Sequence, residues 1–507
     1  MILLALFICF TFYIYLKRKT RNVVPLPPGP PGDPIIGHIR LIPPENQETL
    51  FYKWGKIYGD VIHLRLLGQP VIVLNSIQAA MDLLDKRGAI YSDRPPFLTF
   101  KLMGWKSVVT LMRYGTRFQR HRRMLQQCFS MKQCIEYRTI QLGESRTLLQ
   151  NLLANSDNRD DSVRRFATAI IIRVTFGHQI TTDNDPYVKI ADGIGYALGN
   201  AGSPGASAVD YFPFLQYFPS WFPGAYYAGF ARDNKPVVDT LYDYPLREVS
   251  RQMVEGKAKP SFLATQLEAH NRGGSDFPNT LEDIKGAASA VYGAGVDTIW
   301  STLSMFFLAM VLYPEHQARA QKEIDSVIGS DRLPEFEDRP SLPYVECLLK
   351  ETLRWNSAAP LGVPHRSLED DIYKGMFIPK GSLVIANTRG ITLDENVYSD
   401  AAAFNPARFL PKPSGHGEPF PEGAFGFGRR ICPGRHLADA SLWIVMVSVL
   451  ATLDISKVVD DKGREITPEV VFTSGITSHP YPFRCSIQPR SDASRVLIVQ
   501  GDTSDTY

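Results

Sequence analysis

A long segment, residues 281–312, combines small side chains with a thoroughly apolar continuation and ends just before Pro314. Because proline stops a helix, this pattern predicts one long helix. Residues 48–58 carry aromatic and apolar side chains at helical spacing. Residues 61–67 and 71–74 are two β-rich runs separated by a Gly-Gln-Pro turn. The early part of the chain is therefore expected to form a helix followed by a strand hairpin.

Residues 2–16 are almost wholly apolar, and a basic cluster at residues 17–21 follows at once. Fifteen helical residues span about 23 Å against a hydrocarbon core of about 30 Å, so residues 1–21 are expected to form a short membrane anchor with a basic stop. A cleaved signal peptide is the alternative, although a basic start and a small-residue cleavage site are missing. The basic cluster places residues 22–507 on the cytosolic side of the endoplasmic reticulum membrane in a single-pass topology.

Charge and cysteine content narrow the classes of protein. The chain has 507 residues, 21% of them charged, and a formal net charge of +3. Neither a basic stripe for nucleic acid nor an acidic tail is indicated, so no nucleic-acid partner is expected. The six cysteines show no CxxC pair and no compact zinc or disulfide framework, a pattern typical of a reducing compartment.

One glycine-rich loop, residues 425–434, carries a cysteine and two arginines and leads into an apolar helix. A thiolate needs nearby donors or positive charge, and the N-terminal end of the helix supplies both. Gly428 and Gly434 are expected to adopt conformations that turn amide hydrogens toward the sulfur of Cys432. We interpret Cys432 as the thiolate ligand of a heme iron, with Arg430 near a propionate and Phe425 on the proximal side. A buried core cysteine beside a turn is the alternative.

Phe425, Gly428, Arg430, Cys432 and Gly434 match every fixed position of the heme-binding signature of the cytochromes P450, so the chain resembles these heme-thiolate monooxygenases over residues 25–490. The resemblance implies a mainly α fold with a small β region, and heme b between the I-type and L-type helices. It also implies a proline-rich hinge at residues 22–34 and a single catalytic domain at residues 35–490. Residues 491–507 are expected to be a flexible tail.

Phe118 and Arg122 match the WxxxR helix of the family, with phenylalanine in place of tryptophan. Positions four apart share a helix face, so both side chains can meet one porphyrin edge. Phenylalanine has no N–H donor, so Arg122 would carry more of the propionate binding unless Arg120 or His121 helps. A solvated basic helix face is the alternative.

Two further residues are expected at the propionates by resemblance. Arg94 lies in the segment that resembles the substrate-closing loop, and a solvated loop arginine is its alternative. His365, with Arg366 as runner-up, follows Leu361 and Val363 in a strand that resembles the one passing the heme edge. Side chains near Leu361 and Val363 and at residues 475–477 are expected to line the pocket.

Asp297 and Thr298 resemble the oxygen-activating pair of the family, within a helix expected to widen above the iron. Gly293 and Gly295 just before them each destabilise a helix interior by about 1 kcal/mol relative to alanine, so a specific role is expected for them. By resemblance, Thr298 would hydrogen-bond the bound oxygen and Asp297 would bring protons from bulk water. The alternative is that the Thr298 hydroxyl only bonds to the preceding turn.

Glu351 and Arg354 form the ExxR pair of the family, and Arg408 supplies its third partner. Alone, two charges three apart are usually a surface pair worth a few tenths of a kcal/mol. The resemblance implies instead a buried network behind the cysteine loop. Residues 211–223 are rich in proline and aromatic residues and are expected to dip into the membrane; a core-packed irregular segment is the alternative. Residues 255–280 are expected to form an exposed connection.

The resemblance implies monooxygenation of a small apolar substrate, in which one atom of dioxygen is inserted. No dinucleotide fingerprint is present in suitable context, so electrons must come from another protein. We expect a membrane-bound NADPH-cytochrome reductase near Arg429, Arg430 and Arg435, with cytochrome b5 as a further partner.

Within the family the chain looks like basidiomycete oxidoreductases of secondary metabolism, which include tryptamine hydroxylases. A terpenoid substrate is the first hypothesis, and a polyketide or an indole of the tryptamine type is the alternative. Two other classes stay open: a heme-thiolate isomerase, dehydratase or coupling enzyme, and a non-catalytic heme sensor or carrier. The pair Asp297 and Thr298 favours the monooxygenase.

Overall fold

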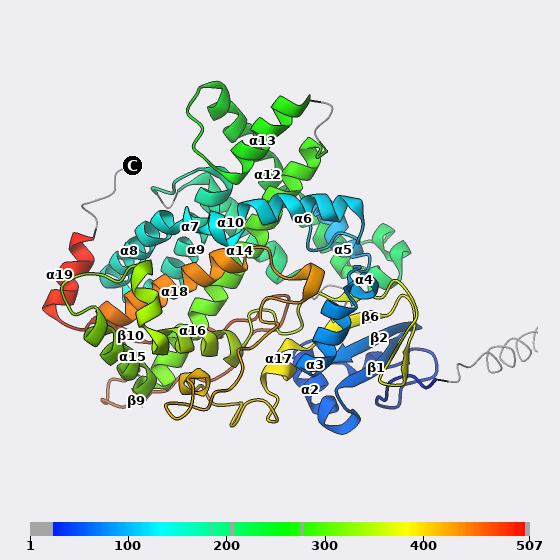
Figure 1. Ribbon diagram of the computed structural model, residues 1–507. Helices are drawn as coiled ribbons and strands as arrows, with labels where there is room; N and C mark the ends of the chain where they lie inside the picture. The colour runs from blue at the N-terminus through cyan, green and yellow to red at the C-terminus, as the bar shows by residue number, and fades with distance from the viewer. Residues whose placement is uncertain (1–23, 183, 203–206, 275–277, 502–507) are drawn as a thin grey trace, which may run out of the picture.

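A computed structural model describes residues 24–182, 184–202, 207–274 and 278–501, so the expected anchor at residues 1–21 lies outside the described residues. Helices form most of the molecule; the largest group of strands lies at one side and shorter strands lie at the other (Figure 1). The predicted mainly α fold with a small β region is confirmed. The helices are α2 (Gln47–Tyr58), α3 (Ile77–Ala80), α4 (Gly88–Tyr91), α5 (Leu98–Leu102), α6 (Thr116–Cys128), α7 (Met131–Ile135), α8 (Arg138–Ala154), α9 (Arg159–Phe176), α10 (Pro186–Gly199), α11 (Ala208–Tyr211), α12 (Tyr226–Val254), α13 (Phe262–Gly273), α14 (Leu281–Leu312), α15 (Pro314–Val327), α16 (Pro343–Trp355), α17 (Thr388–Thr392), α18 (Arg435–Thr452) and α19 (Asp492–Gln500).

The strands form one four-stranded sheet and three pairs. In the larger sheet the order is β1-β2-β6-β3, with β2 and β6 parallel and the other neighbours antiparallel. The predicted hairpin is β1 with β2, and its register pairs Val61 with Leu74. The strands are β1 (Val61–Leu66), β2 (Gln69–Leu74), β3 (His365–Arg366), β4 (Asp371–Tyr373), β5 (Met376–Ile378), β6 (Leu383–Ala386), β7 (Leu453–Ser456), β8 (Val458–Val459), β9 (Glu465–Ile466) and β10 (Ser486–Pro489).

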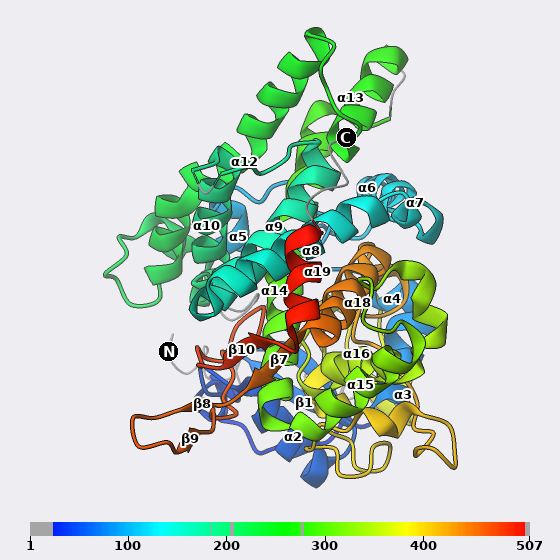
Figure 2. The same cartoon turned by 90° about the vertical axis from the view of Figure 1, so that its left-hand side faces the viewer.

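The long predicted helix is α14, which runs through the centre of the molecule between α9 and α18 (Figure 2). Its first turn is fixed by a capping box, in which Thr280 and Asp283 bond reciprocally. Among the described residues it is the one helix long and apolar enough to cross a membrane, but most of it is buried inside the protein. Its apolar composition is therefore that of a core helix.

The glycines of α14 serve close packing. A Cβ added at Gly295 would lie 2.4 Å from Cδ1 of Ile171 on α9, and one at Gly286 would lie 2.3 Å from the carbonyl oxygen of Ser107. The helix runs as one element from Leu281 to Leu312, and the widening near Thr298 stays a prediction. Close packing gives Gly286 and Gly295 a structural reason of their own.

The predicted charge network behind the cysteine loop is confirmed. Glu351 and Arg354 are fully buried and joined by two hydrogen bonds of 2.7 Å, and Nε of Arg408 donates to Glu351 at 3.0 Å. Arg408 also binds Glu418 at 2.6 Å, a partner that the sequence did not reveal. Two arginines thus face two carboxylates, which balances the buried charge.

Three segments at the outside of the protein are the proline-rich hinge, the C-terminal tail and the connection at residues 255–280. The proline-rich segment is held against the sheet, because the carbonyls of Pro25 and Pro28 accept hydrogen bonds from Phe377 and His63. The expected flexible tail is wrong for Asp492–Gln500, which forms α19 with Ser491 as its cap and packs on α8 and α18. The expected exposed connection at residues 255–280 contains α13, whose buried apolar face packs on α9 and α14.

The aromatic segment is exposed rather than core-packed. Its side chains Tyr217 and Trp221 are 82% and 81% exposed, and Phe214 is 55% exposed. Leu215 alone in this turn is buried against Val209 and neighbours. The segment therefore presents a cluster of aromatic side chains to the surroundings.

Candidate active site

A cavity of about 320 Å³ lies between α14 and the cysteine loop. Ala290, Ala294 and Thr298 of α14 line one side, and Cys432 with Phe425 lines the other. Other lining residues come from the segment before α6, from α9, and from the strand segment with Leu361 and Val363, as expected. Residues 475–477 do not line it, and Ile476 packs against the apolar core instead.

The cysteine loop is shaped by one tight turn. Gly428 has φ +48°, and a Cβ there would lie 2.4 Å from the carbonyl oxygen of Leu84, so glycine is required. The amide of Cys432 donates to the carbonyl of Phe425 at 2.8 Å, which closes the loop. Gly434 has φ −84° and precedes α18 as its N-cap, so the prediction of an unusual conformation there is wrong.

The sulfur of Cys432 sits among donors and positive charge. Burial raises the pKa of its thiol, while the amides of Gly434 and Arg435 and the guanidinium of Arg122 oppose that rise. The other described cysteines are free thiols outside the cavity, and burial raises the pKa of Cys128 and Cys347 to about 11. Cys432 is thus the described cysteine best placed to act as a thiolate ligand.

Arg94 and Arg430 reach the cavity edge and are held by backbone carbonyls. Arg94 is 4% exposed and donates to Thr110, Val363 and Pro364 at 2.6–3.0 Å. The solvated-loop alternative for Arg94 is therefore wrong. Burial and the neighbouring Arg430 lower the pKa of Arg94.

Arg430 makes the same kind of contact, to the carbonyls of Ser92, Val109 and Met112 at 2.7–3.0 Å. Burial lowers its pKa to about 10. Because Arg430 is directed inward, it is not part of the exposed basic face on which a partner was expected to dock. Arg429 beside it is exposed.

Arg122 and His365 complete the basic edge of the cavity. Arg122 is 8% exposed, and its Nε is buried without a hydrogen-bond partner among the described residues. His365 is buried, and its Nδ1 lies 2.8 Å from the carbonyl oxygen of Tyr91. Burial and then Arg94 lower its pKa. His121 instead bonds to Asp283 at 2.9 Å, so it does not assist Arg122.

This edge of the cavity is cationic and lacks a carboxylate. No acidic residue lines the cavity within the described chain, and the nearby Asp93 is already bound by Arg113 at 2.7 Å. Buried cations without counter-charges are costly, so an anionic group is expected to bind there. The donor set fits the two carboxylates of heme b, and Cys432 would supply the thiolate that holds its iron.

A sequence model described as cytochrome P450 matches residues 27–485 of the chain. The chain belongs to the cytochrome P450 family. The predicted resemblance is confirmed, and heme b is the cofactor that this family binds.

Relatives of this P450 are basidiomycete enzymes. It is 41% identical over 501 residues to cytochrome P450 monooxygenase 136 of Postia placenta, and the alignment covers 97% of this chain and 94% of the relative. It is 42% identical over 492 residues to cytochrome P450 monooxygenase claR of Ampulloclitocybe clavipes, with 96% of this chain and 89% of the relative covered. A tryptamine 4-monooxygenase of Psilocybe cyanescens is 36% identical over 491 residues (95% and 96%). This P450 is therefore a monooxygenase.

Asp297 and Thr298 take different directions from α14. Thr298 lines the cavity, and its hydroxyl donates to the carbonyl of Ala294 at 2.8 Å, as the alternative reading expected. Its oxygen can still accept a hydrogen bond. Asp297 instead meets Arg164 of α9, with 3.2 Å between Oδ1 and Nη1.

Arg164 and its neighbour Trp300 were missed at the sequence level. Arg164 lies 133 positions before Asp297, on a helix without a motif, so no local signal connects the two. Trp300 follows Asp297 closely, and its ring lies 4.1 Å from the Arg164 guanidinium. Only the packing of α9 on α14 brings these residues together.

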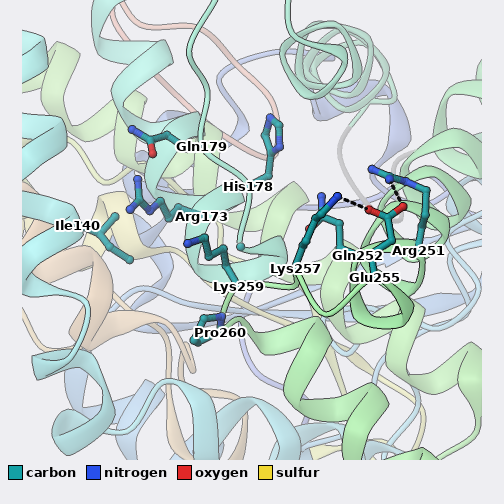
Figure 3. Close-up of a pocket in the computed structure, with 11 residues that line it drawn as sticks. Ile140, Arg173, His178, Gln179, Arg251, Gln252, Glu255, Lys257, Lys259 and Pro260 are labelled. Atoms are coloured by element: carbon teal, nitrogen blue, oxygen red, sulfur yellow. Dashed lines mark hydrogen bonds and ion pairs between the residues drawn. The ribbon is translucent and has the colours of Figure 1, made fainter. Parts of the chain in front are cut away.

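A second hollow, of about 560 Å³, lies where α9 and α12 end (Figure 3). Its lining shares no residue with the cavity at Cys432. Glu255 binds Arg251 at 2.5 Å and Lys257 at 3.2 Å, while His178 binds Asp185 at 2.6 Å. Its lining is mainly cationic, with Arg173 and Lys259 beside the Glu255 pairs, and the described lining residues include no cysteine that could hold a heme iron.

Proposed function

We propose that this P450 hydroxylates, or oxidises further, a small neutral apolar metabolite, with a terpenoid as the first candidate. The observation that supports it most is the cavity, which has Cys432 on one side and apolar residues of α14 on the other. Heme b, when bound, supplies the activation of dioxygen. The surrounding residues exclude water and orient the substrate.

In this proposal Cys432 would hold the heme iron through its thiolate, which the amides of Gly434 and Arg435 would stabilise. Arg94, Arg122 and Arg430 would hold the propionates, with His365 as a further contact. Phe425 would pack beside the sulfur. From the α14 side of the cavity, Thr298 would offer its hydroxyl for hydrogen bonding and Asp297 would supply protons.

The alternative substrate is an indole amine, which the 36% identity to a tryptamine 4-monooxygenase supports. Recognition of an ammonium group by an ion pair requires a carboxylate. The cavity lining in the described chain contains no aspartate or glutamate. A neutral substrate therefore matches the lining better than a charged amine.

Electrons are proposed to come from a membrane-bound NADPH-cytochrome reductase, with cytochrome b5 as a further partner. Family members generally need such a redox partner. Arg123 and Arg429 are exposed on α6 and on the cysteine loop, and they support a basic docking face on the sulfur side. Arg435 is half-buried there.

We propose a single-pass anchor in the endoplasmic reticulum membrane, with the catalytic part facing the cytosol. The exposed aromatic cluster at Phe214, Tyr217 and Trp221 supports a second contact with the lipid headgroups. An apolar substrate could then reach the cavity from the bilayer.

Incubation with the reductase, NADPH and ¹⁸O₂ tests the function. We expect one ¹⁸O atom in the product of a terpenoid, and a smaller yield from tryptamine. A product without ¹⁸O would instead assign the chain to the isomerase or coupling class. NADPH consumption that never responds to any substrate would favour a sensor or carrier.

A further inference from the structure

Asp297 and Thr298 are adjacent on α14 but face different neighbours. Successive residues of an α-helix project about 100° apart. Thr298 lines the cavity, whereas Asp297 does not and instead binds Arg164 of α9. The pair thus connects the cavity to the surface that α14 shares with α9.

The ion pair lies at the boundary with solvent. The side chain of Asp297 is 17% exposed and that of Arg164 is 29% exposed. Gly195 of α10 covers the pair without a side chain: a Cβ there would lie 3.3 Å from Nη1 of Arg164 and 3.9 Å from Oδ1 of Asp297. The Asp297 side chain is therefore partly exposed, while Thr298 lines the cavity.

Arg164 is fixed by an aromatic contact as well as by the ion pair. Its guanidinium lies 4.1 Å from the ring centroid of Trp300, which is three residues after Asp297 and shares its helix face. The ring of His479 lies 4.4 Å from that of Trp300 on the other side. These contacts limit the positions that the guanidinium can take relative to Asp297.

We propose that Arg164 is a positioning residue that keeps Asp297 ionised and directed toward solvent, so that the carboxylate collects a proton there and passes it toward Thr298. This inference rests on the proposed role of Asp297 as the proton donor. Arg164 itself touches neither substrate nor heme in this account. Its role is to keep the Asp297 carboxylate ionised before the proton transfer.

The charges around Asp297 agree with this role. Burial outweighs the lowering effects of Arg164 and then His479, so the pKa of Asp297 lies above its ordinary value. A further titratable group near Asp297 is Tyr292 of α14, whose pKa is also raised by the charge of Asp192 on α10. Burial raises the pKa of Tyr292 and lowers that of His479, so both are uncharged near neutral pH. Arg164 is then the charged partner that opposes protonation of Asp297.

The first test measures the protonation of Asp297 directly by infrared spectroscopy. The carbonyl stretch of the protonated carboxyl is assigned by its loss in Asp297→Asn and followed against pH. We expect its midpoint to rise by about 1–2 pH units in Arg164→Met, because a nearby arginine depresses an aspartate pKa by about that much. Arg164→Lys should stay close to the wild-type midpoint. Arg164→Gln replaces the methionine variant if that variant does not fold.

Arg165→Met is the matched control, since Arg165 is the next residue on α9 and lies 4.0 Å from Glu144 instead. It should leave the Asp297 midpoint unchanged. An unchanged midpoint in Arg164→Met would overturn the proposal. So would an equal shift in the Arg165 variant.

The second test measures product formed per NADPH consumed across pH. We expect the profile of Arg164→Met to shift upward by the same 1–2 pH units, and the Arg164 substitution to have no further effect in Asp297→Asn. If Asp297→Asn forms as much product per NADPH as the wild type, the proposed role of Asp297 fails. If that variant loses product but the Arg164→Met profile does not move, only the positioning role of Arg164 fails.

Discussion

The guanidinium of Arg430 lies 3.7 Å from the ring centroid of Phe118, the residue that replaces the tryptophan of the family motif. Both side chains are inside the protein, and Phe118 is 3% exposed. Phenylalanine cannot donate a hydrogen bond to a propionate, but its ring supports the arginine that is proposed to do so. With phenylalanine at position 118, the side chain supports Arg430 by packing instead of donating to a propionate. The basic edge of the cavity is therefore retained.

Phe118→Ala should lower both stability and heme retention. Loss of a buried phenylalanine costs about 3–5 kcal/mol in the free energy of unfolding, and it removes the support of Arg430. Chemical denaturation and the heme-to-protein ratio measure the two effects. Phe118→Trp should retain heme nearly as the wild type does. Equal heme retention in the alanine variant would contradict the supporting role.

Glu351→Gln should destabilise the protein by about 3–5 kcal/mol, because it leaves Arg354 and Arg408 buried without their shared counter-charge. Both arginines and the glutamate are fully buried. Glu395→Gln breaks an exposed pair with Lys56 and should change stability by less than about 1 kcal/mol. Denaturant unfolding compares the two. A similar small cost for both would show that the buried network is not needed for stability.

Gly295→Ala should destabilise α14 despite the better helix propensity of alanine. That propensity favours alanine by about 1 kcal/mol, but the new Cβ would lie 2.4 Å from Cδ1 of Ile171, and overpacking costs about 1–3 kcal/mol. The cost should be smaller in an Ile171→Val background. Gly143→Ala, where nothing lies within 4 Å, is the control and should be neutral or stabilising. A stabilising Gly295→Ala would contradict the packing explanation.

The ionisation of Asp283 should make the free energy of unfolding depend on pH in the acidic range. Burial acts to raise its pKa, but hydrogen bonds from His121, Arg117 and Thr280 outweigh it and hold the pKa below its ordinary value. A carboxylate with a depressed folded pKa stabilises the protein above its unfolded pKa of about 4, and that contribution is lost as pH falls further.

The matching measurement is urea unfolding of Asp283→Asn beside the wild type at several pH values. The variant should be less stable at neutral pH, and the difference should shrink as pH falls below about 4. A difference that stays constant with pH would show that the ionisation of Asp283 does not stabilise the fold.

Local patterns were enough to predict the long helix, the hairpin, the cysteine loop and the Glu351 network, because spacing and a fixed motif define each of them. They were not enough for Arg164 or Glu418, whose roles depend on contacts between segments far apart in the chain. The tail was misjudged because a short apolar run near the chain end, residues 496–499, does not by itself show that Ile498 is buried against the rest of the protein. The close packing of Gly295 against Ile171 was also missed, because it depends on the neighbouring helix α9.

The central claim is that Cys432 binds the heme iron as a thiolate, and the carbon monoxide difference spectrum of the reduced protein tests it most directly. The wild type should show the strongly red-shifted Soret band of a thiolate-ligated heme, and Cys432→Ala should lack it. Cys485→Ala, which removes another buried cysteine outside the cavity, should keep the band. A wild-type band at the position of histidine-ligated hemes, or a red-shifted band that survives in Cys432→Ala, would contradict the account.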